Sequence, residues 1–173
     1  MDVMPILCET ERLLLRRQQS SDIEFLVNLW ADPQVTRYMG GPRDREWLRA
    51  VFVETAQHPD AEQYDLWPVV EKATDRLVGH CGLLDKEVDG QNEIELTYVL
   101  TPSAWGKGYA TETGQAIAKM AFEQMGVQRL IALIEPENAP SERVALRLGM
   151  HLEKEIVRPG GELRKVYVKE RHP

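Results

Sequence analysis

The sequence predicts an α/β fold, in which one mixed, mostly antiparallel sheet of about seven strands carries helices on both faces. Seven short apolar runs, bounded by charged or turn-forming residues, have the length and pattern of strands. Segments with apolar residues at helical spacing lie between several of these runs. A length of 173 residues with 43% hydrophobic content fits one compact core, so we expect a single domain over 1–173.

The amino-terminal part predicts one strand followed by two helices. Residues 11–17 read E-R-L-L-L-R-R, an apolar run bounded by charge. Ser21 with Glu24 three residues later forms a capping-box pattern, and the helix that follows ends at an Asp-Pro pair. A short helical turn is expected over 34–39. Asp44 then caps a second helix, which closes at a His-Pro pair.

The middle of the chain predicts an antiparallel meander and then a crossover. Strands over 64–72 and 77–85 are joined by a tight turn, and a strand over 93–100 follows an Asp-Gly turn. Connections this short join antiparallel neighbours. A glycine-bearing loop, a helix over about 110–125 and a strand over 130–134 come next. This strand-helix-strand order requires a crossover, which predicts a parallel pair inside the sheet.

The carboxy-terminal part predicts one more helix and a hairpin. The helix covers 138–148 and is stopped by Gly149. Strands over 152–157 and 166–168 flank a Pro-Gly-Gly turn and complete the seven.

Composition and charge exclude several classes of function. A nucleic-acid partner needs a basic surface, whereas this chain has a formal net charge of −7 and a pI of about 5.2. Cys8 and Cys81 lack metal-ligand spacing, so we expect reduced thiols in a cytoplasmic protein, with a single disulfide as the alternative. No histidine pair has metal-ligand spacing, so no metal is expected. Residues 1–7 lack the pattern of a signal peptide, and no apolar run approaches the roughly 20 residues of a membrane span.

The segment 100–112 carries the most informative chemistry, because a strand ends, Gly106 and Gly108 follow, and a helix begins. Unpaired amides at a helix start attract anions, and glycine lets the backbone approach a ligand closely. The pattern therefore predicts a pyrophosphate cradle, to which Lys107 adds a cation. A Walker A loop is excluded because its motif is absent, and a Rossmann fingerprint lacks its third small residue at Thr111. A purely structural turn is the remaining alternative.

This segment resembles the acetyl-CoA-binding motif of the GNAT superfamily of N-acetyltransferases, which is Gln or Arg, two residues, Gly, one residue, then Gly or Ala. Gly108 and Ala110 match the small positions, whereas Trp105 replaces the Gln or Arg. The run W-G-K-G-Y-A-T-E is similar to the branch that contains ribosomal-protein-alanine N-acetyltransferases. Residues 137–150 resemble the fourth helix of the family, and T-E-R-L-L-L-R near the start resembles the same branch. The resemblance covers nearly the whole chain.

The resemblance implies a GNAT fold, acetyl-CoA as the cosubstrate and no metal. In this family the strand before the glycine loop is splayed from the next strand, so the central parallel pair is expected to form a V-shaped cleft. The implied cofactor-binding residues of that strand are Tyr98, Val99 and Leu100. Those of the loop and the following helix start are Trp105, Gly106, Lys107, Gly108, Tyr109, Ala110 and Thr111. Asn138 and Ser141 are expected at the pantetheine arm, and the alternative for Asn138 is to cap its own helix.

The implied reaction is direct attack of a neutral amine on the thioester carbonyl, which needs a base for the amine proton. Glu95 is the predicted base, because this branch carries a glutamate at that point of the cleft strand. Glu93 shares its face, and the alternative is that both are solvated surface charges. Ser141 is the predicted partner of the departing sulfur, since Ala145 stands where many members have a tyrosine. Tyr167 is the fallback for this role.

The resulting hypothesis is an acetyl-CoA-dependent N-acetyltransferase acting on a primary amine, either a protein N-terminus or a small amine. The alternative is a non-catalytic acyl-CoA-binding sensor or regulatory module. Acceptor pockets are built from variable loops, so the acceptor stays open. Tyr38, Met39 and Trp47 are expected to touch it. We expect a cytoplasmic monomer or homodimer with no nucleic-acid partner and no membrane partner.

Overall fold

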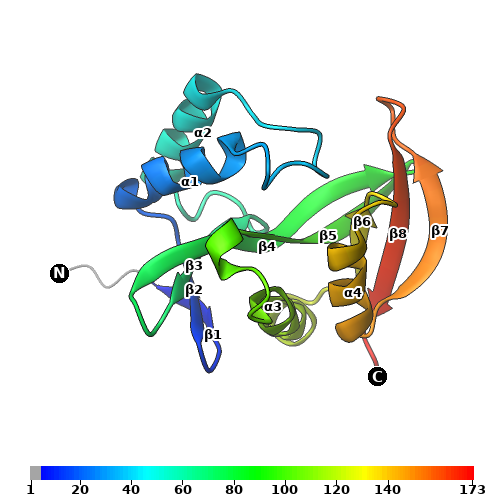
Figure 1. Cartoon of the computed structure of the whole chain (residues 1–173). Helices are drawn as coiled ribbons and strands as arrows, with labels where there is room; N and C mark the ends of the chain where they lie inside the picture. Colours follow the sequence, from blue (N-terminus) through cyan, green and yellow to red (C-terminus); the bar gives the residue numbers. More distant parts are fainter. Residues whose placement is uncertain (1–4) are drawn as a thin grey trace.

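A computed structural model describes residues 5–173 and contains one eight-stranded sheet in the order β1-β2-β3-β4-β5-β6-β8-β7 (Figure 1). All neighbouring strands are antiparallel except β5 and β6. This confirms the predicted α/β fold class, with one strand more than the sequence indicated. From the sequence we expect no signal peptide over residues 1–7. Residues 1–4 of that stretch lie outside the described residues.

The additional strand belongs to a hairpin of β1 (Ile6–Glu9) and β2 (Leu13–Arg16). Thr10 closes the turn, because its amide donates to the Leu13 carbonyl at 2.9 Å and its hydroxyl accepts from the Leu13 amide at 3.0 Å. Leu13 and Leu15 are fully buried, as the period of two along a strand requires. β2 is therefore the predicted first strand, and β1 pairs along its outer edge.

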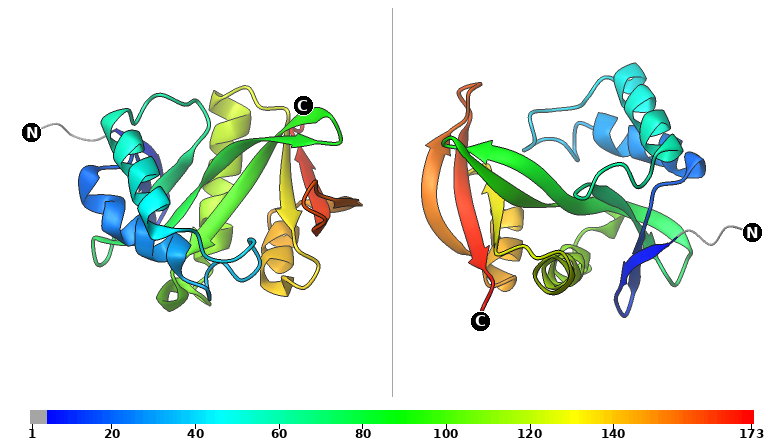
Figure 2. Two further views of the ribbon diagram at one scale, coloured as in Figure 1. Left: turned by 90° about the horizontal axis from the view of Figure 1, so that it is seen from above. Right: turned by 180° about the vertical axis from the view of Figure 1, so that it is seen from behind.

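Two helices, α1 (Ile23–Ala31) and α2 (Arg45–Gln57), cover one face of the sheet (Figures 1 and 2). Their apolar faces meet each other and the sheet in one buried cluster. Its members are Leu26, Val27, Leu29, Trp30, Leu48, Phe52, Leu66 and Val99.

The helix starts show one confirmed cap and one wrong prediction. Asp44 caps α2 as expected, since its carboxylate accepts from the Trp47 amide at 2.8 Å. The capping box at Ser21 and Glu24 is wrong, because a 3-10 turn η1 (Ser20–Asp22) precedes α1. Asp22 instead accepts a 2.7 Å bond from the amide three residues before it.

The predicted meander is confirmed as β3 (Leu66–Glu71), β4 (Arg76–Val88) and β5 (Gln91–Leu100). Asp75 and Asp89 adopt positive φ angles of 55° and 51° in the two connecting turns. Aspartate tolerates this left-handed conformation better than most residues, which explains its place there. β4 and β5 pair over ten positions and form the longest hairpin of the sheet.

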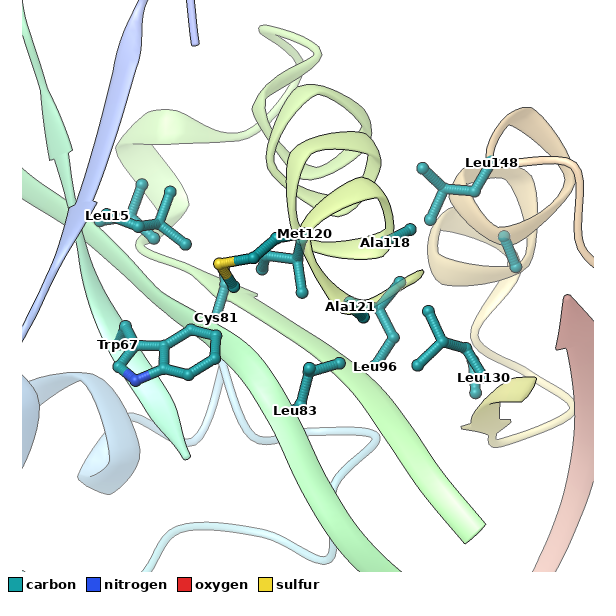
Figure 3. Close-up of a cluster of buried hydrophobic side chains, with 14 of the residues drawn as sticks. Leu15, Trp67, Cys81, Leu83, Leu96, Ala118, Met120, Ala121, Leu130 and Leu148 are labelled. Carbon is teal, nitrogen blue, oxygen red and sulfur yellow. The ribbon is translucent and has the colours of Figure 1, made fainter. Parts of the chain in front are cut away.

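The crossover from β5 runs through η2 (Pro102–Ala104) and α3 (Tyr109–Gln124) to β6 (Arg129–Ile134), and α4 (Ala139–Arg147) follows. α3 and α4 lie on the face opposite α1 and α2 (Figure 2). Figure 3 shows the core between this helical layer and the sheet, including Cys81, Leu83, Leu96, Met120, Ala121, Leu130 and Leu148.

The chain ends in the predicted hairpin, β7 (His151–Val157) and β8 (Leu163–Glu170), with β8 inserted between β6 and β7. Cys8 and Cys81 are unpaired, which confirms the expected free thiols. Among residues 5–173, no helix has the length and apolar character to cross a membrane.

Candidate active site

β5 and β6 form a parallel pair that separates after one register position. Glu95 pairs with Ile131 in the one register pair of β5 and β6. Figure 2 shows the two strands diverging toward their carboxyl ends. We name this divergence the β5–β6 fork. Beyond Glu95, β5 pairs with β4 alone among residues 5–173, so the backbone groups of its other edge have no strand partner and an extended ligand can pair with them.

The alternation of backbone groups along β5 decides which residues face the fork. The Thr101 amide donates to a β4 carbonyl at 2.9 Å, and the regular register extends this pattern to every second residue, including Val99. Tyr98 and Leu100 therefore direct their backbone groups toward the fork. The Leu100 carbonyl already accepts from the Trp105 indole at 2.9 Å. Of the three strand residues predicted at the acetyl-pantetheine arm, Tyr98 is the best placed.

Glu95 lies where the fork opens. Its side chain is 13% exposed, and the Lys86 ammonium lies 3.7 Å from its carboxylate. Burial raises the pKa of Glu95, while Lys86 and the Leu133 amide act in the opposite direction. A buried carboxylate with a raised pKa is suited to general-base work, which a solvated surface charge is not.

Glu93 and Glu95 have different charge partners in the structure, a difference that alternation along the strand could not predict. The Glu93 carboxylate accepts from the Arg129 guanidinium at 3.1 and 3.2 Å, and Arg129 also binds Glu153 at 2.6 Å. Glu93 is therefore committed to an ion-pair network between β5, β6 and β7. Glu95 has weaker charge partners: the Lys86 ammonium lies 3.7 Å away, and Arg158 acts on it through its charge alone.

The glycine loop has the conformation that its sequence requires. Gly106 and Gly108 have φ angles of 75° and 79°, which favour glycine, and Gly108 is the N-cap residue that precedes α3. Trp105 is 46% exposed, and its bond to the end of β5 fixes the loop entrance. The Lys107 ammonium lies 3.7 Å from the Glu71 carboxylate, so the cation expected at the cradle forms an ion pair with Glu71.

Tyr109 and Glu112 anchor the loop from the start of α3. The Tyr109 ring is buried, lies 4.6 Å below the Arg12 guanidinium, and its hydroxyl donates to Glu71. Glu112 accepts from Arg12 at 3.1 Å and from Thr10 at 3.0 Å. These contacts engage side chains. The Trp105 amide already donates to the Pro102 carbonyl at 3.1 Å, so the amides available to a ligand are those from Gly106 onward.

Ala110 and Thr111 lie in the first turn of α3, next to these amides. The Thr111 hydroxyl is buried and finds no hydrogen-bond partner within residues 5–173. A buried hydroxyl without a partner is costly, so its position beside a helix start fits an anionic ligand such as a phosphate group.

The start of α4 brings Asn138 and Ser141 together. The Asn138 side chain accepts from the Ser141 amide at 3.3 Å and donates to the Ser141 hydroxyl at 3.0 Å. Asn138 therefore caps the helix, and the Ser141 hydroxyl keeps its own hydrogen for another acceptor. Tyr167, the fallback, is buried near Glu142, and burial raises its pKa to about 12.

The residues expected at the acceptor lie in and after the loop between α1 and α2. Residues 33–40 form consecutive turns instead of the predicted short helix. Met39 packs against the α1–α2 cluster, and Tyr38 is half-buried beside Arg37. Trp47 is 58% exposed on α2. The structure thus places Met39 close to the sheet and Trp47 in solvent.

Two features of the site were missed by sequence reasoning. Lys86 lies opposite Glu93 in the β4–β5 hairpin, and counting back from the Asp-Gly turn would have found it. The Tyr98 hydroxyl donates to the Ser141 carbonyl at 2.9 Å, a contact between distant segments with no sequence signal. Within the described residues, no three His, Cys, Asp or Glu side chains group as metal ligands.

Comparison with known proteins gives one consistent match. The family model described as "Acetyltransferase (GNAT) domain" matches residues 12–151. The "Uncharacterized N-acetyltransferase YnaD" of Bacillus subtilis (strain 168) is 32% identical over 156 residues, which cover 88% of this chain and 89% of that protein.

Solved structures agree with the sequence comparison. A GNAT-family acetyltransferase from Bacillus anthracis is 29% identical with a TM-score of 0.76, covering 94% of this chain and 96% of that one. An acetyltransferase from Agrobacterium tumefaciens str. C58 is 26% identical with a TM-score of 0.80, covering 99% and 97%.

Proposed function

The chain belongs to the GNAT acetyltransferase family, and from this premise we propose that it acetylates a primary amine, either a protein N-terminus or a small amine. It is an acetyl-CoA-dependent acetyltransferase, as its family is. The observation that carries the proposed acceptor chemistry is the buried carboxylate of Glu95 at the β5–β6 fork.

In this proposal, acetyl-CoA supplies the acetyl thioester and the chain holds it at two places. The loop from Gly106 to Gly108 and the first turn of α3 bind the pyrophosphate through backbone amides, while the Trp105 amide donates to the Pro102 carbonyl. Two positive φ angles and the unpartnered Thr111 hydroxyl support this assignment. Tyr98 pairs with the acetyl-pantetheine arm, because its backbone groups turn toward the fork.

Glu95 takes the proton from the attacking nitrogen. As the nitrogen lone pair forms the new N–C bond, the C–S bond breaks and the proton passes to the carboxylate. Burial raises the pKa of Glu95 and makes it a better proton acceptor, while Lys86 keeps it ionisable. Glu93 is less suited, since Arg129 occupies its carboxylate.

Ser141 stabilises the sulfur that leaves. Its hydroxyl accepts from Asn138, so its hydrogen is free to donate to the thiolate. The serine takes the role that the family resemblance gives to a tyrosine at position 145, where this chain has Ala145. The released CoA thiolate takes its proton from water.

Calorimetric titration with acetyl-CoA, followed by a thiol-release screen, tests the proposal. The screen contains N-terminal peptides, amino acids, polyamines and aminoglycosides. We expect acetyl-CoA to bind and at least one amine to release free CoA and gain an acetyl group. Binding without turnover by any amine favours the acyl-CoA sensor instead, and no binding overturns the assignment of the loop.

A further inference from the structure

Thr97 carries a buried hydroxyl that nothing in the described chain satisfies. The residue is 8% exposed, and its Oγ1 has no hydrogen-bond partner within residues 5–173. A buried hydroxyl without a partner costs free energy that a valine of the same shape would not. Because Thr97 lies on β5 beyond the last β5–β6 pair, a ligand in the fork can supply the missing partner.

The position of Thr97 on β5 places its hydroxyl on the same sheet face as the proposed base. It lies two residues from Glu95 on β5, so both side chains project from the same face of the sheet. This is the face covered by α1 and α2, because Leu84, the cross-strand partner of Glu95, packs in their cluster with Met39. Thr97 also lies beyond the last β5–β6 pair, at the open part of the fork.

A primary amine has two N–H donors, one for the Glu95 carboxylate and one for the Thr97 hydroxyl. A neutral primary amine has one lone pair and two N–H bonds. In the proposed reaction the lone pair faces the thioester carbon and one N–H faces Glu95. The second N–H needs an acceptor near the base, and the free oxygen of Thr97 lies on the same strand face.

We propose that Thr97 is an acceptor-binding residue, whose hydroxyl accepts the second N–H of the amine and selects primary over secondary amines. This rests on the proposed function. A secondary amine has one N–H, so it leaves the Thr97 oxygen unpaired in the reactive complex. The cost of an unpaired buried group makes such a site discriminate more strongly than shape alone.

Thr97→Val tests the inference, with Thr97→Ser as the conservative variant and Thr113→Val as a matched control. Thr113 is fully buried on α3, on the other face of the sheet, and its hydroxyl also has no hydrogen-bond partner among the described residues. Each protein is assayed for kcat/KM with the best amine of the screen and with its N-methyl derivative. Urea midpoints and acetyl-CoA affinities are measured in parallel.

We expect Thr97→Val to lower kcat/KM for the primary amine about tenfold and to reduce the preference over the N-methyl derivative by a similar factor. Its urea midpoint and acetyl-CoA affinity should equal or exceed those of the wild type. Thr97→Ser and Thr113→Val should retain the wild-type preference.

Two results overturn the inference while the proposed function stands. One is a Thr97→Val enzyme with wild-type kcat/KM and wild-type preference. The other is a parallel loss of activity and urea midpoint, which assigns Thr97 a structural role. If the wild type releases no CoA with any amine, the proposed function fails, and this inference fails with it.

Discussion

The hydroxyl of Tyr98 donates a 2.9 Å hydrogen bond to the backbone carbonyl of Ser141. The bond joins β5 to the first turn of α4. It therefore connects the strand edge proposed to hold the acetyl-pantetheine arm with the serine proposed to stabilise the departing sulfur. The Tyr98 hydroxyl thus links the β5 part of the candidate site to the α4 part.

Tyr98→Phe removes this connection without removing the ring. We expect the free energy of unfolding to fall by about 1 kcal/mol, since one partly buried hydrogen bond is lost. Urea denaturation measures this change. Tyr64→Phe is the control, because Tyr64 is a half-buried tyrosine packed against the same core cluster. Equal effects of the two variants would contradict a specific role for the Tyr98 bond.

Ser141→Ala tests the stabilisation of the thiolate. The variant keeps the Ser141 amide, which donates the capping hydrogen bond to the Asn138 side chain, so the stability of α4 should change little. The kcat should fall about tenfold with little change in KM for acetyl-CoA, because the lost hydrogen bond forms as the sulfur leaves. A variant with unchanged kcat would remove Ser141 from the mechanism.

Gly108→Ala tests the pyrophosphate cradle. Gly108 has a φ of 79°, and an added Cβ would strain the backbone by about 1 kcal/mol or more at the edge of the proposed ligand site. Gly126 has a φ of 72° at the other end of α3, with nothing within 4 Å of its Cβ position. Both variants should lose similar stability, but only Gly108→Ala should weaken acetyl-CoA binding in calorimetry. Equal affinities would contradict the cradle.

His80 makes stability depend on pH. Burial lowers its pKa from 6.5 to about 4, and the Trp30 indole donates to its Nδ1 at 3.0 Å, which requires that nitrogen to be unprotonated. The unfolded chain therefore binds a proton that the folded chain excludes. Stability falls as pH drops from about 6.5 to about 4, by on the order of 3 kcal/mol.

Urea denaturation of wild type and His80→Gln at a series of pH values measures this dependence. The variant should show a flatter decline over the same window. His151→Gln, at an exposed histidine, should keep the wild-type slope. A His80→Gln slope equal to that of the wild type would assign the acid sensitivity to other groups.

The sequence predicted the sheet topology well, because it depends on local patterns. Alternating apolar runs and turn residues located seven strands, and the glycine loop located the start of α3. The strand that was missed, β1, has four residues and owes its structure to pairing with β2. Such short edge strands carry too little periodicity to be recognised alone.

The residues of the candidate site were found by resemblance, but their roles depend on contacts between distant segments. Alternation placed Glu93 and Glu95 on one face without distinguishing them. Arg129, 36 residues from Glu93, makes the distinction. Tyr98 and Ser141 are 43 residues apart, so their bond follows from tertiary packing that no local pattern encodes.

The pH dependence of CoA release by wild type and Glu95→Gln tests the central claim most directly. The carboxylate is the active form of the base, so the wild-type rate should rise with pH through the raised pKa of Glu95. Glu95→Gln should be slower by about a hundredfold and should lack this acidic limb, retaining only the rise due to deprotonation of the amine. A Glu95→Gln enzyme with the wild-type rate and the wild-type pH profile would contradict the assignment of Glu95 as the base.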